Sequence, residues 1–233
     1  MWKFQCMGFP VGVHWWFWLT MFLLGGGASG APAQIWVLFV LAAFLSVMVH
    51  ELGHALAGKK YGAYPSIYLH GFGGVTTLPG AYFSRNQSMW VSFAGPLASM
   101  GLALASWMVF PAMESMSQMS QIFVALLFQI NVFWTILNLL PIQPLDGGQI
   151  FRDFMGPHRR DVVRWVSVII ASLVAFWALR VGQLFLCMMM AYMAFMNYQH
   201  TPGEGGVVLV SLQSHECFGT SLSSLSWAQN RSE

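Results

Sequence analysis

Residues 34–54 read QIWVLFVLAAFLSVMVHELGH, and this stretch decides the fold of the chain. Its first sixteen residues carry no charge and are nearly all apolar, and His50-Glu51-Leu52-Gly53-His54 follows at once. Residues four apart share one face of a helix, so His50 and His54 can bind the same metal ion. Glu51 lies about 100° around the helix and can act on a water molecule there. Ionisable side chains at the end of an apolar run are costly in lipid and usually mark function, so we expect a metal site.

The composition is typical of a protein embedded in a membrane. Of the 233 residues, 57% are hydrophobic and only 8% are charged, whereas about a quarter of the residues of a soluble domain are charged. The formal net charge of +2 is too small to indicate a nucleic-acid partner. Cys6, Cys187 and Cys217 are too far apart to form a metal-binding spacing or a disulfide framework. We therefore expect an all-α polytopic membrane protein surrounded by the lipid bilayer.

Six apolar stretches are candidates for membrane-spanning helices, each of which needs about 20 residues. They are residues 11–24, 34–58, 89–110, 121–140, 162–179 and 182–198. The first stretch could also be a cleaved signal peptide, but its Trp-Trp-Phe-Trp run is more typical of an interfacial anchor. At 1.5 Å per residue, His50 lies about 24 Å along a hydrocarbon core about 30 Å thick. The site is therefore expected inside the membrane, near one face.

The segment after the second span, residues 61–85, has no helical pattern. Its glycines and prolines surround two short runs, 67–69 and 75–77, which predict a short β-hairpin-like segment. His70 lies in this segment and is either a third metal ligand or, more simply, an exposed loop residue. His14, in the first stretch, is expected to be a hydrogen-bonded structural histidine.

Lysine and arginine are distributed unevenly between the two ends of the expected spans. Nine of the ten lie on the side of the N-terminus, and only Arg180 lies on the other. Because positive charge is enriched in cytoplasmic loops, both termini and the histidine pair are expected to face the cytoplasm. We expect a transmembrane domain over residues 1–198, with a core at about 34–150. A flexible cytoplasmic tail, rich in Ser and Gly, is expected over 199–233.

The third metal ligand is identified by elimination. Catalytic zinc usually takes three protein ligands and leaves one position for water. The metzincin pattern would need glycine and histidine where Ala57 and Lys60 stand, and Glu114 is expected on the opposite side of the membrane. Asp153 and Asp161 lie among arginines and are expected to be solvated loop charges. Asp146 remains, and the second and fourth spans run in the same direction, so it reaches the face of the histidines. One Zn²⁺ held by two neutral imidazoles and one carboxylate keeps a net positive charge, which favours hydroxide at neutral pH.

These residues, together with several short motifs, resemble the site-2 protease family of intramembrane metalloproteases. The motifs are HELGH (50–54), FGGV (72–75), AGP (94–96), NLLP (138–141) and LDGG (145–148), within residues 34–150. The resemblance implies that His50, His54 and Asp146 bind zinc and that Glu51 is the general base. It also implies that Asn138 helps to hold the substrate or its oxyanion. With no PDZ-like insertion, the chain is similar to the compact members of the family.

Two residues depart from the pattern of this family. Ser99 stands where many members have Asn after Ala-Gly-Pro, and Gln143 stands where Pro or another small residue is common. We expect neither residue to contact the metal ligands, so that the departures affect only packing and the fit of the substrate.

The resemblance implies zinc-dependent hydrolysis of a peptide bond within or near the transmembrane segment of a single-span membrane protein, in a bacterial inner membrane. The predicted strands either pair with the extended substrate or only cap the site. One alternative is a metal transporter, which should scatter its ligands near the middle of the membrane and has no need of Glu51. The other is a catalytically inactive, protease-like scaffold, which would tolerate loss of a ligand or of the base. None of these residues is lost here.

Overall fold

Helix α2 is the longest helix of the described residues and carries the histidine pair. The computed structural model describes residues 1–199, and α2 extends over 28 of them, Ala33–Lys60, or about 42 Å. Pro32 precedes the helix, at a position where its fixed φ favours a helix start. Lys59 and Lys60 end it, and their positive charges are favourable beside the last carbonyl groups. The predicted apolar helix is confirmed.

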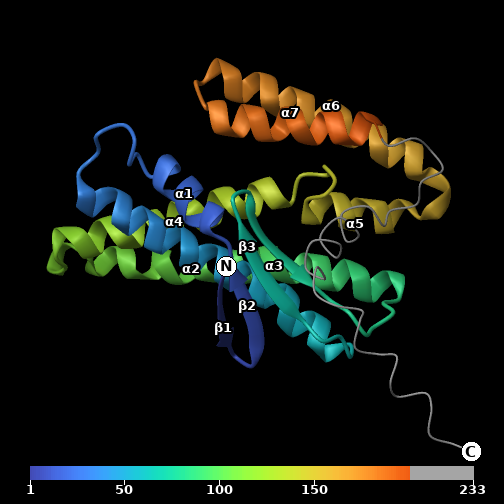
Figure 1. The fold of residues 1–233 in the computed structure, drawn as a ribbon, viewed down its shortest axis with the longest axis horizontal. Coiled ribbons are helices and arrows are strands. Elements are labelled where there is room, and N and C mark those ends of the chain that lie inside the picture. Colours follow the sequence, from blue (N-terminus) through green and yellow to red (C-terminus); the bar gives the residue numbers. More distant parts are fainter. Residues whose placement is uncertain (200–233) are drawn as a thin grey trace, which may run out of the picture. The chain divides into compact units, whose positions relative to one another are not determined.

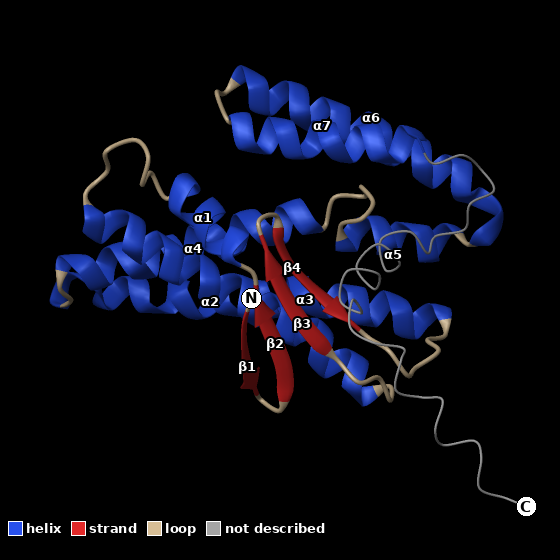
Figure 2. Cartoon of the chain, viewed as in Figure 1, coloured by secondary structure: helices blue, strands red, loops and turns tan. Residues whose placement is uncertain are grey.

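The other elements are short strands, two near the N-terminus and two after α2, and further helices (Figures 1 and 2). In chain order they are β1 (Trp2–Cys6), β2 (Phe9–Val13), α1 (Trp15–Leu24), β3 (Ser66–His70), β4 (Gly73–Thr77), α3 (Arg85–Val109), η1 (Phe110–Ser115), α4 (Gln118–Asn138), α5 (Asp146–Met155), η2 (Pro157–Arg159), α6 (Arg160–Arg180) and α7 (Leu184–Gln199). The chain is therefore mostly helical, with a small sheet.

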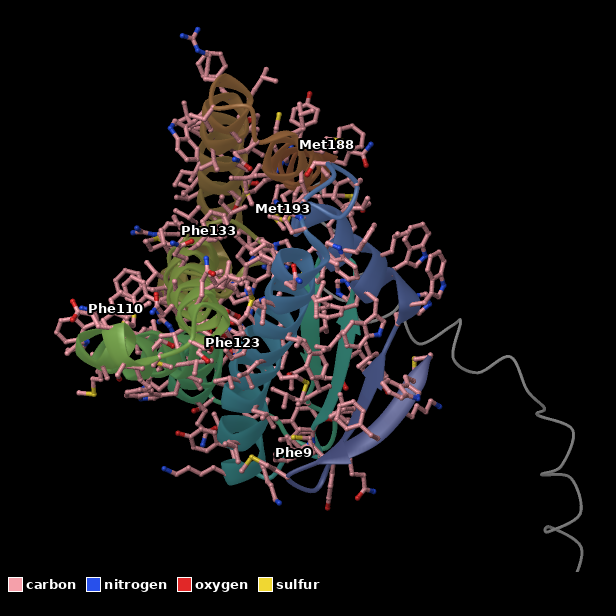
Figure 3. The ribbon with its side chains drawn as sticks, turned by 90° about the vertical axis from the view of Figure 1, so that its left-hand side faces the viewer. Phe9, Phe110, Phe123, Phe133, Met188 and Met193 are labelled. Carbon is pink, nitrogen blue, oxygen red and sulfur yellow. The ribbon has the colours of Figure 1, made fainter. Side chains whose placement is uncertain are left out.

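Four helical segments of the described residues are long and apolar enough to cross a membrane. They are Ala33–Lys60, Arg85–Ser115, Gln118–Asn138 and Pro157–Arg180. The prediction of about six spans is confirmed for these four, whereas the first and last predicted spans correspond to shorter apolar helices, α1 and α7. Helix α1 has 10 residues and α7 has 16, which span about 15 and 24 Å against a hydrocarbon core of about 30 Å. Large apolar side chains of the helices point outward, including Phe133 on α4 and Met188 on α7 (Figure 3), as expected of a surface in contact with lipid.

The segment formed by β2 and α1 lies antiparallel along α2. Three contacts establish its direction. Lys59 Nζ lies 5.2 Å from the centre of the Phe9 ring. The ring centres of Trp18 and Phe44 are 5.3 Å apart, and those of Phe22 and Trp36 are 5.0 Å apart. As the residue numbers of β2 and α1 rise, those of their partners on α2 fall. The segment therefore returns along α2 as a strand followed by a short helix.

The sheet has the strand order β1-β2-β3-β4. Strands β3 and β4 pair antiparallel and form the predicted hairpin, which is confirmed. Strands β1 and β2 were not predicted; β1 pairs antiparallel with β2, and β2 pairs parallel with β3. The alternating residues Phe9, Val11, Val13, Ile67 and Leu69 are each at most 2% exposed, and Figure 3 labels Phe9 where the sheet meets the last turns of α2. This period of two explains why 11–13 belong to a strand and not to the predicted helix.

Helices α2, α3 and α4 pack against one another, and α3 also contacts α5. Helix α3 begins with a capping box formed by Ser84 and Gln87. Helices α6 and α7 form a hairpin that turns at Gly182, whose φ of 76° favours glycine. A second apolar cluster, which includes Leu137 and Ile142, joins this hairpin to the end of α4.

Helix α5 was not predicted from the sequence. The Asp-Gly-Gly sequence at 146–148 indicates a turn, but in the structure it forms the first turn of the helix Asp146–Met155. The predicted tail, 199–233, lies outside the described residues except for Gln199, the last residue of α7.

Candidate metal centre

His50, His54 and Asp146 converge on one buried point. His50 Nε2 lies 3.2 Å from His54 Nε2 and 3.1 Å from Asp146 Oδ2, and His54 Nε2 lies 3.3 Å from Asp146 Oδ1. Each residue offers one ligand atom, and these atoms all lie within 4.8 Å of one another. All three residues are at most 8% exposed. The structure thus brings Asp146, at the start of α5, to the two histidines on α2.

Two glycines fix the position of Asp146 through close backbone packing. A Cβ on Gly147 would lie 2.2 Å from the Leu139 carbonyl oxygen, and one on Gly148 would lie 2.4 Å from the Ile142 carbonyl group. Real Cβ atoms do not approach this closely, so a larger residue at either position would push the turn away. The Asp-Gly-Gly sequence therefore lets the first turn of α5 press against the end of α4.

Helix α3 orients both imidazole rings. His54 Nδ1 lies 2.7 Å from the Val91 carbonyl oxygen, and His50 Nδ1 lies 3.0 Å from Ser99 Oγ. Between these contacts, a Cβ on Gly95 would lie only 2.2 Å from His54 Nε2. Val91, Gly95 and Ser99 are spaced by four residues and so lie on one face of α3. The Ala-Gly-Pro motif thus provides the glycine that makes room for a ligand.

The contact of Ser99 with His50 corrects one expectation from the sequence. Ser99 was expected not to contact a metal ligand, and this is wrong, because its fully buried hydroxyl is within hydrogen-bond distance of His50. Ser99 lies one helical turn after Gly95, and this spacing could have indicated its contact with His50. The hydrogen bonds of Gln143 are to Ser167 and Asn197, and among the described residues none joins it to His50, His54 or Asp146.

The chemistry of the converging atoms fits a metal cation. A carbonyl oxygen only accepts, so His54 Nδ1 carries the proton and a neutral His54 presents a lone pair at Nε2. That lone pair points toward the Asp146 carboxylate, whose buried Oδ2 receives no hydrogen bond. Acceptor atoms gathered in a buried place repel one another unless a cation lies between them. Two imidazole nitrogens and a carboxylate oxygen are a usual donor set for catalytic zinc.

Glu51 lies beside this cluster but is not one of its three members. It is 4% exposed, and its Oε2 accepts a hydrogen bond of 2.7 Å from Thr76 Oγ1 on β4. On the same strand, a Cβ on Gly74 would lie 2.5 Å from Glu51 Oε1. Strand β4 therefore packs directly on Glu51, a contact that the sequence did not predict.

Asn138, His70 and His14 lie outside the cluster. Asn138 Nδ2 donates to the Trp134 carbonyl oxygen at 3.0 Å, the only hydrogen bond of its side chain among residues 1–199. His70 Nδ1 accepts from the Phe72 N–H, and burial, followed by the nearby His14, lowers the pKa of His70. His14 caps the N-terminus of α1, as expected of a structural residue.

Comparison with known proteins relates the chain to membrane peptidases. The model of Peptidase family M50 matches residues 110–179, which contain Asn138 and Asp146. A putative zinc metalloprotease of Mycobacterium tuberculosis, Rip3, is 31% identical over 172 residues. A zinc metalloprotease of Methanocaldococcus jannaschii is 30% identical over 159 residues. The aligned parts make up 67% and 65% of this chain, but only 44% of each relative.

The fold also has a counterpart among solved structures. The site-2 protease from Methanocaldococcus jannaschii superposes with a TM-score of 0.61 and 23% sequence identity, covering 85% of this chain and 94% of that one. This likeness concerns the fold, and the sequence relationships above concern the family. The buried cluster of His50, His54 and Asp146 agrees with these relationships. The chain belongs to the site-2 protease family, Peptidase family M50.

Proposed function

We propose that this chain is an intramembrane zinc metalloprotease that hydrolyses a peptide bond within or near the transmembrane segment of a single-span membrane protein. The observation that carries the proposal is the buried cluster of His50, His54 and Asp146 beside Glu51. The two histidines and Glu51 lie on α2, which is long and apolar enough to cross a membrane. A metal-binding trio alone would suit storage or transport. A buried carboxylate next to it, outside the trio, suits proton transfer in hydrolysis.

Each of the four residues has a distinct proposed role. His50, His54 and Asp146 would hold one zinc ion, which when bound activates water and polarises a carbonyl group. Glu51 accepts a proton from the water and passes it to the amine that leaves. Its Oε2 accepts the Thr76 hydroxyl, and its Oε1 has no hydrogen bond among the described residues, so one oxygen is available for the proton.

Asn138 is proposed to contact the substrate near the scissile bond. It is the last residue of α4, eight residues before Asp146, where α5 begins. Its Nδ2 carries a second N–H that no described residue accepts, and such a group can donate to a developing oxyanion. The competing role is to fix the 141–144 segment so that Asp146 is directed to the metal.

The substrate is proposed to bind as an added strand on β4. Strand β4 ends the strand order, so its outer edge has no strand partner among the described residues. A helical substrate hides its carbonyl groups in hydrogen bonds and must be extended before it can be attacked. Pairing with the edge of β4 would hold it extended, and β4 contacts Glu51 through Gly74 and Thr76.

Six membrane crossings are proposed, although only four helical segments are of full length. Strand β2 and helix α1 together extend about 32 Å at the usual rise per residue, enough for one crossing, and they lie along α2. Non-helical backbone is tolerated at membrane depth where protein covers it. Helix α7 would provide the last crossing. The uneven lysine and arginine count then directs both termini and the metal centre toward the cytoplasm, in a bacterial inner membrane.

The proposal is tested with purified protein and a peptide that contains one transmembrane segment. We expect the wild type to contain about one zinc ion per chain and to cleave the peptide. Glu51→Gln should keep the zinc and lose cleavage, whereas Glu114→Gln, a matched change on the exposed turn η1, should behave as the wild type. Zinc binding without any cleavage by the wild type would favour the inactive scaffold, and cleavage by Glu51→Gln at the wild-type rate would contradict the assigned base.

A further inference from the structure

Strand β4 packs against the Glu51 side chain at two of its residues, Thr76 and Gly74. Thr76 Oγ1 lies 2.7 Å from Glu51 Oε2 and 3.2 Å from the Glu51 backbone oxygen. An ionised carboxylate only accepts, so the hydroxyl donates, and its single hydrogen favours the nearer Oε2. Gly74 lies two residues earlier, on the same face of the strand, and a Cβ there would meet Glu51 Cγ and Oε1 at 2.5 Å. The side chain of Glu51 therefore has little freedom to turn toward β4.

This arrangement matters because a glutamate side chain is otherwise adaptable. Free rotation about its side-chain bonds would spread the two oxygens over many positions, and confining them costs entropy. A hydrogen bond between a hydroxyl and a carboxylate is among the stronger kinds. It lies in a part-buried setting, where water competes less for the same oxygen. One carboxylate oxygen is thus fixed by Thr76, and the orientation of the other follows from it.

We propose that Thr76 is a positioning residue for Glu51, and that it acts by fixing the carboxylate for proton transfer without itself touching the substrate. The inference rests on the proposed function, since Glu51 needs a fixed orientation only if it transfers a proton. The role of the Thr76 side chain differs from the role proposed for the edge of β4, because the latter involves backbone groups. The side-chain hydroxyl of Thr76 acts on the enzyme, whereas the backbone of the strand acts on the substrate.

The neighbouring residue provides a matched control. Thr77 lies on the same strand and is also part-buried, but its Oγ1 donates to the Ser66 carbonyl oxygen at 3.3 Å, across the hairpin. Consecutive residues of a strand point to opposite faces. Replacement of either threonine by valine keeps the β-branched shape and removes only the hydroxyl. Any general effect on the hairpin should therefore appear in both variants, and an effect on Glu51 should appear only at Thr76.

The test compares Thr76→Val, Thr76→Ser and Thr77→Val in cleavage of a single-span peptide, with zinc content measured on the same samples. We expect Thr76→Val to lower kcat by about 10-fold or more, the usual effect of losing a hydrogen bond to a charged group. KM and zinc content should remain near the wild-type values. Thr76→Ser restores the hydroxyl and should recover most of kcat, and Thr77→Val should match the wild type. Thr76→Ala, which removes the same hydroxyl, should repeat the loss if the valine variant does not fold.

The outcomes separate the inference from the function on which it rests. An inactive wild type would contradict the proposed function. An active wild type with equal kcat in Thr76→Val and Thr77→Val would overturn the role of Thr76 alone. A loss of kcat in Thr76→Val that is accompanied by loss of zinc, or that Thr76→Ser does not recover, would show that Thr76 maintains the site as a whole and would also overturn the inference.

Discussion

Ser99 Oγ lies 3.0 Å from His50 Nδ1, so a buried hydroxyl on α3 orients one of the two candidate metal-binding imidazoles of α2. If His50 binds a metal through Nε2, its Nδ1 carries the proton and donates it to Ser99. His54 is held in the same manner by the Val91 carbonyl oxygen. The two rings are therefore fixed by one helix face, and the contacts of α3 with α2 determine the geometry of the site.

Ser99→Ala is expected to weaken zinc binding without removing a ligand. Loss of a hydrogen bond to a metal-binding histidine commonly reduces metal affinity by about 10- to 100-fold. Competition with a chelator of known affinity measures the change. Ser106→Ala is the control, because Ser106 is also buried on α3 but donates only to the Leu102 carbonyl oxygen. Equal zinc affinities for the two variants would contradict the role of Ser99.

Gly95→Ala is expected to remove zinc binding. The added methyl group would lie 2.2 Å from His54 Nε2, the nitrogen directed at the candidate metal, so His54 must leave its position. Gly101→Ala is the matched control on the same helix, because a Cβ at Gly101 meets no atom within 4 Å and alanine favours the helix. The zinc content of the two purified variants tests this prediction. A Gly95→Ala protein with full zinc would show that His54 has another position from which it can bind the metal.

The ligand set is expected to act as a unit. His50→Ala, His54→Ala and Asp146→Ala should each lose zinc and cleavage activity together, because each offers one of the three converging atoms and a catalytic zinc site needs all of them. Glu51→Gln should keep zinc. Zinc content and peptide cleavage are measured on the same preparations. An Asp146→Ala protein with full zinc and normal cleavage would contradict the assignment of Asp146 as the third ligand.

The sequence was sufficient for the parts of the site that depend on spacing along one helix and on the order of the spans. His50 and His54 lie on one helical face, and the common direction of the second and fourth spans correctly brought Asp146 to them. Ser99 and Thr76 could not be predicted in this way, because their contacts join α3 and β4 to α2 through tertiary packing. Residues 11–13 of strand β2 were included in a predicted helix because their short alternation adjoins a strongly apolar run, which resembles a spanning helix in composition.

The orientation in the membrane is expected to place the end of α2 in the cytoplasm. In a protein without its three native cysteines, Lys60→Cys should react with a membrane-impermeant reagent only from the cytoplasmic side, and Glu114→Cys only from the other. Both positions are exposed, so access is decided by the membrane. The charge distribution motivates the prediction. Reaction of both cysteines from one side would contradict the proposed number of crossings.

Asn138→Ala is expected to lower turnover and to keep zinc. The side chain is half-buried and tied to its own helix by the bond to the Trp134 carbonyl oxygen, which fixes the amide and leaves one N–H available. An amide held in this way is suited to donate to an oxyanion, and loss of one such donor usually reduces turnover by about 10²-fold or more. Zinc content and kcat of the purified variant are the measurements.

The two proposed roles of Asn138 predict different relationships between zinc and activity. As a contact to the substrate, Asn138 affects kcat while zinc content stays near normal. As a support for the 141–144 segment, it would affect the position of Asp146, so zinc and activity would fall together. Gln143→Ala is a useful comparison, because only the backbone of Gln143 bonds to Ser167 and Asn197, and its replacement should change neither quantity. Unchanged activity in Asn138→Ala would remove this residue from the site.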